Sequence, residues 1–129
     1  MIQVKDVVKS FDGNVVLDHI SADFEDGKVN MIIGQSGSGK TVLMKSMIGL
    51  HQIDGGEIIF DTRNGQKNLA EMKEKEVRML HREVGMLFQG AALFDSMTVQ
   101  ENVMYPLEMF SDMTDEEKVA RARFCLERV

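Results

Sequence analysis

The feature that most constrains the fold is the eight-residue stretch Gly34-Gln35-Ser36-Gly37-Ser38-Gly39-Lys40-Thr41. It matches the pattern G-x-x-x-x-G-K-[ST], in which glycines let successive backbone N–H groups surround an anion. The apolar run 29–33 before it predicts a buried strand, and residues 41–50 after it predict a helix. Because the motif works in this strand-loop-helix order, the sequence predicts a phosphate-binding loop, with a glycine-rich turn beside a surface lysine as the alternative.

Each residue type in the loop has an expected task. Gly34, Gly37 and Gly39 are expected to permit positive φ angles and close approach of the backbone to phosphate oxygens. The Lys40 ammonium is expected to reach the β- and γ-phosphates of a nucleotide. The Thr41 hydroxyl is expected to ligate the Mg²⁺ that accompanies a nucleoside triphosphate.

Length, charge and cysteine content narrow the class of protein. The 129 residues amount to one domain, and a formal net charge of -6 argues against a general affinity for nucleic acid. The single cysteine, Cys125, fits a reducing compartment. With no apolar run of membrane-spanning length and no signal peptide pattern, we expect a soluble, cytoplasmic chain.

Turn signals divide the first half of the chain into short strands. Residues 2–9 and 15–24 are rich in Val and Ile and flank the turn 12–14, which predicts a β-hairpin. Residues 57–60 predict a further short strand, and Asn64-Gly65 predicts another hairpin turn.

The middle of the chain combines a charged helix with an apolar segment. Residues 67–82 carry Glu–Lys and Glu–Arg pairs four positions apart, which predicts a solvated helix. Residues 84–88 form a compact apolar run and predict a second buried strand that ends at Gln89.

Two helices are expected in the last third. Residues 98–110 look helical, but Pro106 should end or kink that helix. Thr114 and Glu117 form a capping box that predicts the start of the next helix. One face of that helix gathers the apolar side chains of Val119, Ala122, Cys125, Leu126 and Val129.

The other candidate residues give little indication of a catalytic or metal-binding site. Asp61 and Asp95 each follow an apolar run, but Thr62 and Ser96 come next rather than a glutamate that could act as a base, so no catalytic acid is expected. We expect His19, His51 and His81 to occupy surface or packing positions. We expect no nucleophile role for Ser36 and Ser38.

The phosphate-binding loop, the run Gly85-Met86-Leu87-Phe88-Gln89 and the run Thr98-Val99-Gln100-Glu101-Asn102-Val103 together resemble the nucleotide-binding subunit of an ABC transporter. The resemblance implies an α/β fold of the P-loop NTPase class, of ABC ATPase type. It implies an antiparallel β subdomain, a partial parallel core sheet and the start of a helical subdomain. Residues 1–95 would belong to the core and residues 96–129 to the helical subdomain, in truncated form.

The same resemblance implies a set of site residues. Phe11 stands where an aromatic residue, more usually Tyr, stacks on adenine, and core packing is the alternative for it. Gln89 matches the Q-loop glutamine that reaches the magnesium and the attacking water, with an ordinary polar strand end as the alternative. Nucleotide contacts are implied for Phe11, Gly34, Gln35, Ser36, Gly37, Ser38, Gly39, Lys40, Thr41 and Val42, and magnesium contacts for Thr41 and Gln89.

By resemblance, the parent protein hydrolyses ATP with Mg²⁺ to drive transport. Its partners would be transmembrane permease subunits and a second ATPase subunit in a head-to-tail dimer, on the inner face of the cell membrane. Residues 84–95, Val42, Val103 and Pro106-Leu107 are similar to ATPases of the Mla or MCE-linked lipid transporters.

Several alternatives to the lipid branch stay open. Lipoprotein-release, cell-division and amino-acid-import ATPases share much of the same pattern. A soluble ABC ATPase acting on DNA or ribosomes is a further alternative, and so is a nucleotide-binding fragment without turnover.

The chain also departs from the family. The family's LSGGQ signature, its Asp-Glu segment and its switch histidine would all lie beyond Val129. We therefore expect this chain alone to bind nucleotide without hydrolysing it. We also expect its phosphate-loop strand to lack a neighbour and to promote self-association.

Overall fold

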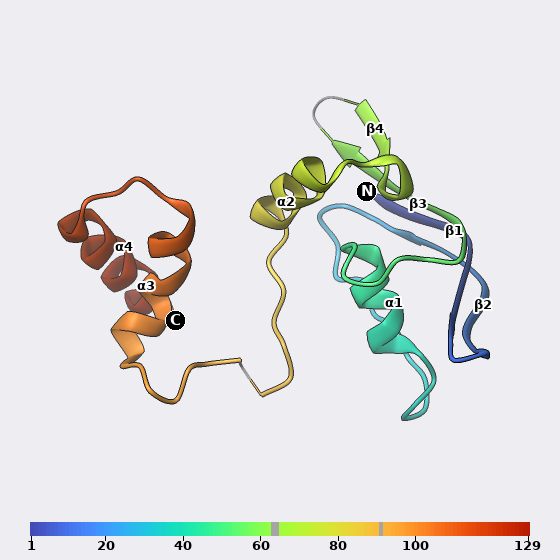
Figure 1. Ribbon diagram of the computed structural model, residues 1–129, viewed down its shortest axis with the longest axis horizontal. Helices are drawn as coiled ribbons and strands as arrows, with labels where there is room; N and C mark the ends of the chain where they lie inside the picture. The colour runs from blue at the N-terminus through green and yellow to red at the C-terminus, as the bar shows by residue number, and fades with distance from the viewer. Residues whose placement is uncertain (63–64, 91) are drawn as a thin grey trace. The chain divides into compact units, whose positions relative to one another are not determined.

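The computed structural model describes residues 1–62, 65–90 and 92–129, and the chain divides into two compact units, Met1–Gly85 and Met86–Val129 (Figure 1). Asn64 of the predicted turn and Ala91 lie outside the described residues. The boundary predicted at residue 95 concerns domains of the parent protein and stays a prediction.

A four-stranded antiparallel sheet forms the centre of the first unit. Its strands are β1 (Ile2–Phe11), β2 (Asn14–Phe24), β3 (Gly55–Thr62) and β4 (Gly65–Asn68), in the order β2-β1-β3-β4. β1 and β2 form the hairpin that the sequence predicts, with Phe11 paired to Asn14 across a tight turn. β3 pairs with β1 on one side and with β4 on the other.

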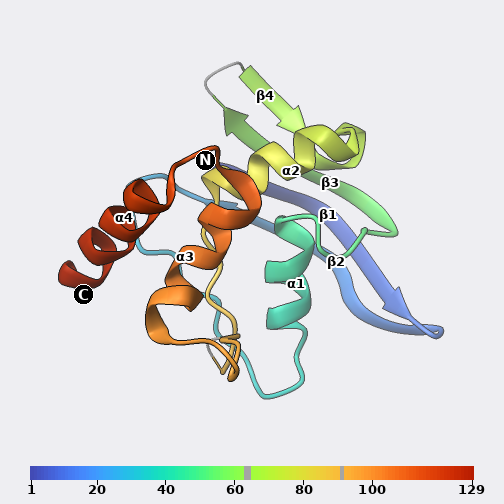
Figure 2. The same cartoon turned by 60° about the vertical axis from the view of Figure 1, so that its left-hand side comes forward.

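Helices pack on this sheet and close a small core. α1 (Lys40–Met47), the short 3₁₀ helix η1 (Leu69–Glu71) and α2 (Glu74–Glu83) belong to the first unit. Figure 2 labels α1 and α2 beside the strands of the sheet. Alternating positions of the strands and single faces of α1 and α2 supply the buried side chains. The core consists of Val4, Val7, Leu17, Leu43, Met47, Ile58, Phe60 and Leu80.

The prediction of a helix over residues 67–82 is wrong for the first half of that range. Residues 65–68 form β4 instead, and the Asn68 side chain accepts a hydrogen bond from the Ala70 N–H, which starts η1. Only α2 is a full helix, and the predicted Glu74–Arg78 ion pair lies on it. The preference of Asn for turns and helix caps ends the strand here.

The prediction that residues 29–33 and 84–88 form parallel core strands is wrong for this chain. Both segments lack strand pairing, and the side chains of Val29 and Ile33 are 94% and 86% exposed. A strand of a parallel sheet is stable when neighbours pair its backbone groups and cover both its faces. Within the described residues neither segment has such a neighbour.

The second unit contains the helices α3 (Val99–Phe110) and α4 (Asp115–Glu127). Each helix begins with a capping box. The sequence predicts the one at Thr114, which starts α4, and a second one at Thr98 starts α3. α3 continues through Pro106, so of the two expected effects the proline does not end the helix, and a kink there stays a prediction. Proline removes a single helix hydrogen bond, and the bond from the Ser111 N–H to the Leu107 carbonyl maintains the helix beyond it.

The predicted apolar face of α4 is only partly buried. Ala122 is buried, whereas Leu126 and Val129 are exposed. Among the helices of the described residues, none combines the length and apolar character that crossing a bilayer requires.

Candidate functional site

The glycine-rich loop 34–39 leads directly into the first turn of α1. The Ser38 N–H donates to the Gln35 carbonyl at 3.2 Å, which closes a tight turn inside the loop. Gly39 is the N-cap of α1, and the Leu43 N–H donates to the Gly39 carbonyl at 2.8 Å. The predicted loop-to-helix arrangement is therefore present, although the segment before the loop is not a strand.

The three loop glycines differ in what they require. Gly37 and Gly39 have φ angles of 80° and 88°, as the sequence predicts. Gly34 does not have a positive φ angle, so the expectation of a positive φ angle is wrong for this residue. A Cβ on Gly34 would instead lie 2.6 Å from Ser38 Oγ, so the absence of a side chain makes room for a neighbouring loop residue.

The close packing of Gly39 against β2 escaped the sequence analysis. A Cβ on Gly39 would lie 2.9 Å from the Val16 carbonyl oxygen and 3.2 Å from Leu17 Cδ2. The loop is therefore pressed against the hairpin at this point. No local pattern reveals such a contact, because Val16 lies more than twenty residues away along the chain.

The ammonium of Lys40 lies over the loop that precedes it. Its Nζ donates to the Gly34 carbonyl at 2.8 Å and to the Gln35 carbonyl at 2.6 Å. These contacts hold a full positive charge beside the backbone of residues 34–39. A phosphate bound by that backbone would meet this charge as well as the N–H groups.

The N-terminus of α1 has the electrostatic character of an anion site. Gly39 supplies no side-chain cap, and no acidic residue lies in the first turn. The first N–H groups of a helix lack helical partners and carry a partial positive charge. Thr41 is exposed in this turn, and Val42 packs against the core, so Thr41 is the more accessible of the two.

Phe11 lies at the end of β1, 37% exposed, and contacts two polar side chains. The ring of His51 meets it edge-on with 5.4 Å between ring centroids, and Lys9 Nζ lies 5.1 Å from its centroid. Lys9 in turn pairs with Asp54 at 2.8 Å. Phe11 is therefore not packed in the core, which was the alternative to adenine stacking. Adenine stacking itself stays a prediction.

Gln89 belongs to the second unit, where it is exposed and lies outside the helices. The loop 34–41 and Phe11 belong to the first unit. The role of Gln89 at magnesium and water therefore remains a prediction from resemblance.

The two aspartates set aside in the sequence analysis have structural surroundings of their own. The Asp61 carboxylate accepts a hydrogen bond from Gln66 Nε2 at 2.9 Å and lies 3.8 Å from the terminal ammonium. Asp95 is exposed. Within the described part of the chain, no three His, Cys, Asp or Glu side chains cluster as metal ligands would.

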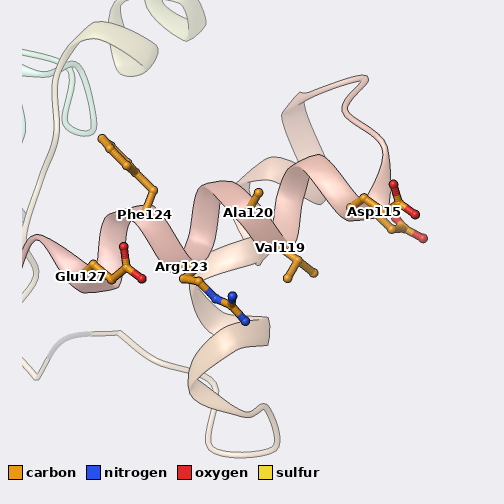
Figure 3. A pocket seen from close by; sticks show the side chains of 7 residues that line it. Asp115, Val119, Ala120, Arg123, Phe124 and Glu127 are labelled. Atoms are coloured by element: carbon orange, nitrogen blue, oxygen red, sulfur yellow. The ribbon is translucent and has the colours of Figure 1, made fainter.

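A shallow depression of about 540 Å³ runs along α4 in the second unit (Figure 3). Its lining residues recur every three or four positions, so they form one stripe of a single helix. They include Asp115, Val119, Ala120, Arg123, Phe124 and Glu127. No predicted nucleotide or magnesium contact is among them, so we place the candidate site at the loop 34–41 instead.

Comparisons with known proteins agree with this arrangement. The family model described as "ABC transporter" matches residues 17–129. The methionine import ATP-binding protein MetN of Clostridium tetani is 38% identical over 111 residues, covering 85% of this chain and 33% of MetN. The phosphonates import ATP-binding protein PhnC of Fusobacterium nucleatum is 33% identical over 137 residues, covering 100% of this chain and 53% of PhnC.

A solved structure shows the same fold. The dimeric structure of MJ0796, a bacterial ABC transporter cassette, aligns with a TM-score of 0.83 and 28% identity, covering 98% of this chain and 56% of that one. This chain thus spans between a third and somewhat more than half of the proteins it matches. Because the family model covers most of the chain and the fold agrees, the chain belongs to the ABC transporter ATP-binding cassette family, of which it represents an N-terminal part.

Proposed function

We propose that the parent protein is the ATP-binding subunit of an ABC importer, and that residues 34–42 of this chain hold the phosphates of ATP. The observation that carries the proposal is the uncapped N-terminus of α1 beside the Lys40 ammonium. Backbone N–H groups, a helix dipole and a full positive charge converge on the same loop.

The transported solute is proposed to be a small polar molecule rather than a lipid. The names of MetN and PhnC both describe import ATP-binding proteins, one for methionine and one for phosphonates. Amino-acid import was an alternative in the sequence analysis, and these relatives support it better than the lipid branch. Neither name describes a lipid transporter, so the similarity to Mla or MCE-linked transporters is not part of this proposal.

Magnesium fits the proposed site through oxygen ligands. The hydroxyl of the exposed Thr41, at the start of α1, would supply one of these ligands. We propose that Gln89 adds its amide oxygen and helps to position the attacking water. When bound, the metal would neutralise charge on the phosphates.

The partners follow from the same proposal. Permease subunits in the membrane and a second ATP-binding subunit would complete the transporter, with this subunit on the cytoplasmic face. MJ0796 forms a dimer, and cbiO1 of Clostridium perfringens is part of the ABC transporter complex cbiONQ. Both precedents support an assembled state for the parent protein.

Calorimetric titration with ATP tests the proposed phosphate site. Replacing Lys40 by Ala removes a charge-assisted contact, so we expect ATP affinity to fall about tenfold to a hundredfold. Lys45→Ala is the matched control, because Lys45 carries the same charge in the last turn of the same helix. Equal losses in both variants, or no loss in Lys40→Ala, would refute the assigned role.

A further inference from the structure

A second pocket, of about 410 Å³, lies entirely within the first unit. Its walls come from the C-terminal end of α1, residues 51–53, η1 and the beginning of α2; α1 and α2 are labelled in Figure 1. Residues 34–42 do not line it, so it is separate from the proposed nucleotide site.

Ser46 is the most deeply buried residue of the pocket lining. Its side chain is completely buried, whereas every other lining residue is half-buried or exposed. Within the described residues, Ser46 Oγ has no hydrogen-bond partner. Buried hydroxyl groups in folded proteins nearly always have a partner, so an unpaired one lining a pocket points to a ligand group.

Apolar side chains form the middle of the pocket. Ile53, Leu69 and Met72 are partly buried and pack against the core, and Val77 lies opposite Gly49. Gly49 has a φ angle of 76°, and a Cβ there would lie 3.2 Å from Val77 Cγ1. An apolar body of a ligand would therefore find contacts on several sides.

The charges around the pocket select against an ionic ligand. Among the described lining residues, the exposed Glu74 carries the one carboxylate and pairs with Arg78, and His51 is the other titratable side chain. The carbonyl end of α1 adds partial negative charge, which disfavours an anion. Ser46 offers no countercharge at the buried end, so an ammonium there would lose its hydration without compensation.

We propose that this pocket binds a small uncharged organic molecule with an apolar body and one hydroxyl group, and that the hydroxyl pairs with Ser46 Oγ. Such a molecule satisfies the unpaired group and covers the apolar walls at once. The site would act alongside the nucleotide site and does not depend on it.

The test is an NMR titration of the isotope-labelled protein with 2-phenylethanol. We expect saturable shifts of the amide signals of residues 46–53 and 69–77. Ethylbenzene lacks the hydroxyl, and phenylacetate carries a negative charge, so both are expected to bind at least threefold more weakly. Shifts that do not saturate, or that spread over the whole surface, would overturn the proposal.

Two variants tie the binding to the pocket. Ser46→Ala should reduce the affinity for 2-phenylethanol about threefold to tenfold and leave ethylbenzene unaffected. Ala70→Trp should fill the space from η1 and abolish binding, and Ala70→Leu serves the same purpose with less bulk. Unchanged affinity for 2-phenylethanol in Ser46→Ala and in the Ala70 variants would contradict the assignment.

Discussion

Single residues of the loop 34–41 are fixed by contacts as well as by backbone conformation. Gly37 and Gly39 share a positive φ angle, but open space surrounds the missing side chain of Gly37, whereas that of Gly39 would meet the Val16 carbonyl. The sequence pattern predicts both glycines equally. Only the structure separates them, because the contact joins distant parts of the chain.

We predict that Gly39→Ala lowers the free energy of unfolding by about 2 to 3 kcal/mol, because strain in the left-handed region adds to a steric clash. Gly37→Ala, the matched control, should cost about 1 kcal/mol, because only the strain applies. Chemical denaturation of both variants measures the difference. Equal costs would show that the contact between Gly39 and β2 is absent.

At the scale of elements, the antiparallel hairpin and the capped helices are predictable because their signals are local. Turn residues mark the β1–β2 hairpin, and Thr98 and Thr114 mark the starts of α3 and α4. The segments 29–33 and 84–88 are apolar runs that form strands only beside neighbouring strands. The sequence of such a segment cannot show whether those neighbouring strands are present. Whether Phe11 stacks on adenine likewise depends on information that no local pattern contains.

The contrast between a paired and an unpaired apolar segment can be measured. Ile58 in β3 is 0% exposed, whereas Ile33 is 86% exposed. We predict that Ile58→Ala lowers the free energy of unfolding by about 2 to 5 kcal/mol, and that Ile33→Ala changes it by less than about 0.5 kcal/mol. Thermal and chemical denaturation report both values. A large cost at Ile33 would mean that its side chain is buried in solution.

The two capping boxes of the second unit predict a pH dependence. Hydrogen bonds from the Thr98 N–H and hydroxyl lower the pKa of Glu101 below its usual 4.5, and Thr114 does the same to the pKa of Glu117. A lowered folded-state pKa contributes stability above the usual value, and that stability is lost as pH falls through the folded pKa. Helix content measured by circular dichroism should therefore decrease below about pH 4.5.

Glutamine provides the control for this pH effect. Glu101→Gln and Glu117→Gln keep a side chain that can accept from the cap N–H but remove the titrating group. The double variant should lose the part of the pH dependence that comes from α3 and α4. An unchanged acid transition would show that other carboxylates cause it.

At the scale of the whole molecule, this chain combines a glycine-rich loop, proposed to bind phosphate, with the fold of an ABC transporter ATP-binding cassette. The loop leads into α1 and packs against β2 at Gly39, and α1 shares one core with the sheet and α2 in the same compact unit. Its family and fold follow from the match to the ABC transporter model and to MJ0796. The proposed transport function belongs to the parent protein, of which this chain resembles the first part.

We propose above that residues 34–42 recognise the phosphates of a nucleotide. The most direct measurement is a calorimetric series in which ATP, ADP, AMP and adenosine are titrated into the protein with Mg²⁺ present. We predict that affinity falls as phosphates are removed, with adenosine binding about a hundredfold or more weakly than ATP, because each lost phosphate removes charge-assisted contacts. Adenosine binding as tightly as ATP would contradict it.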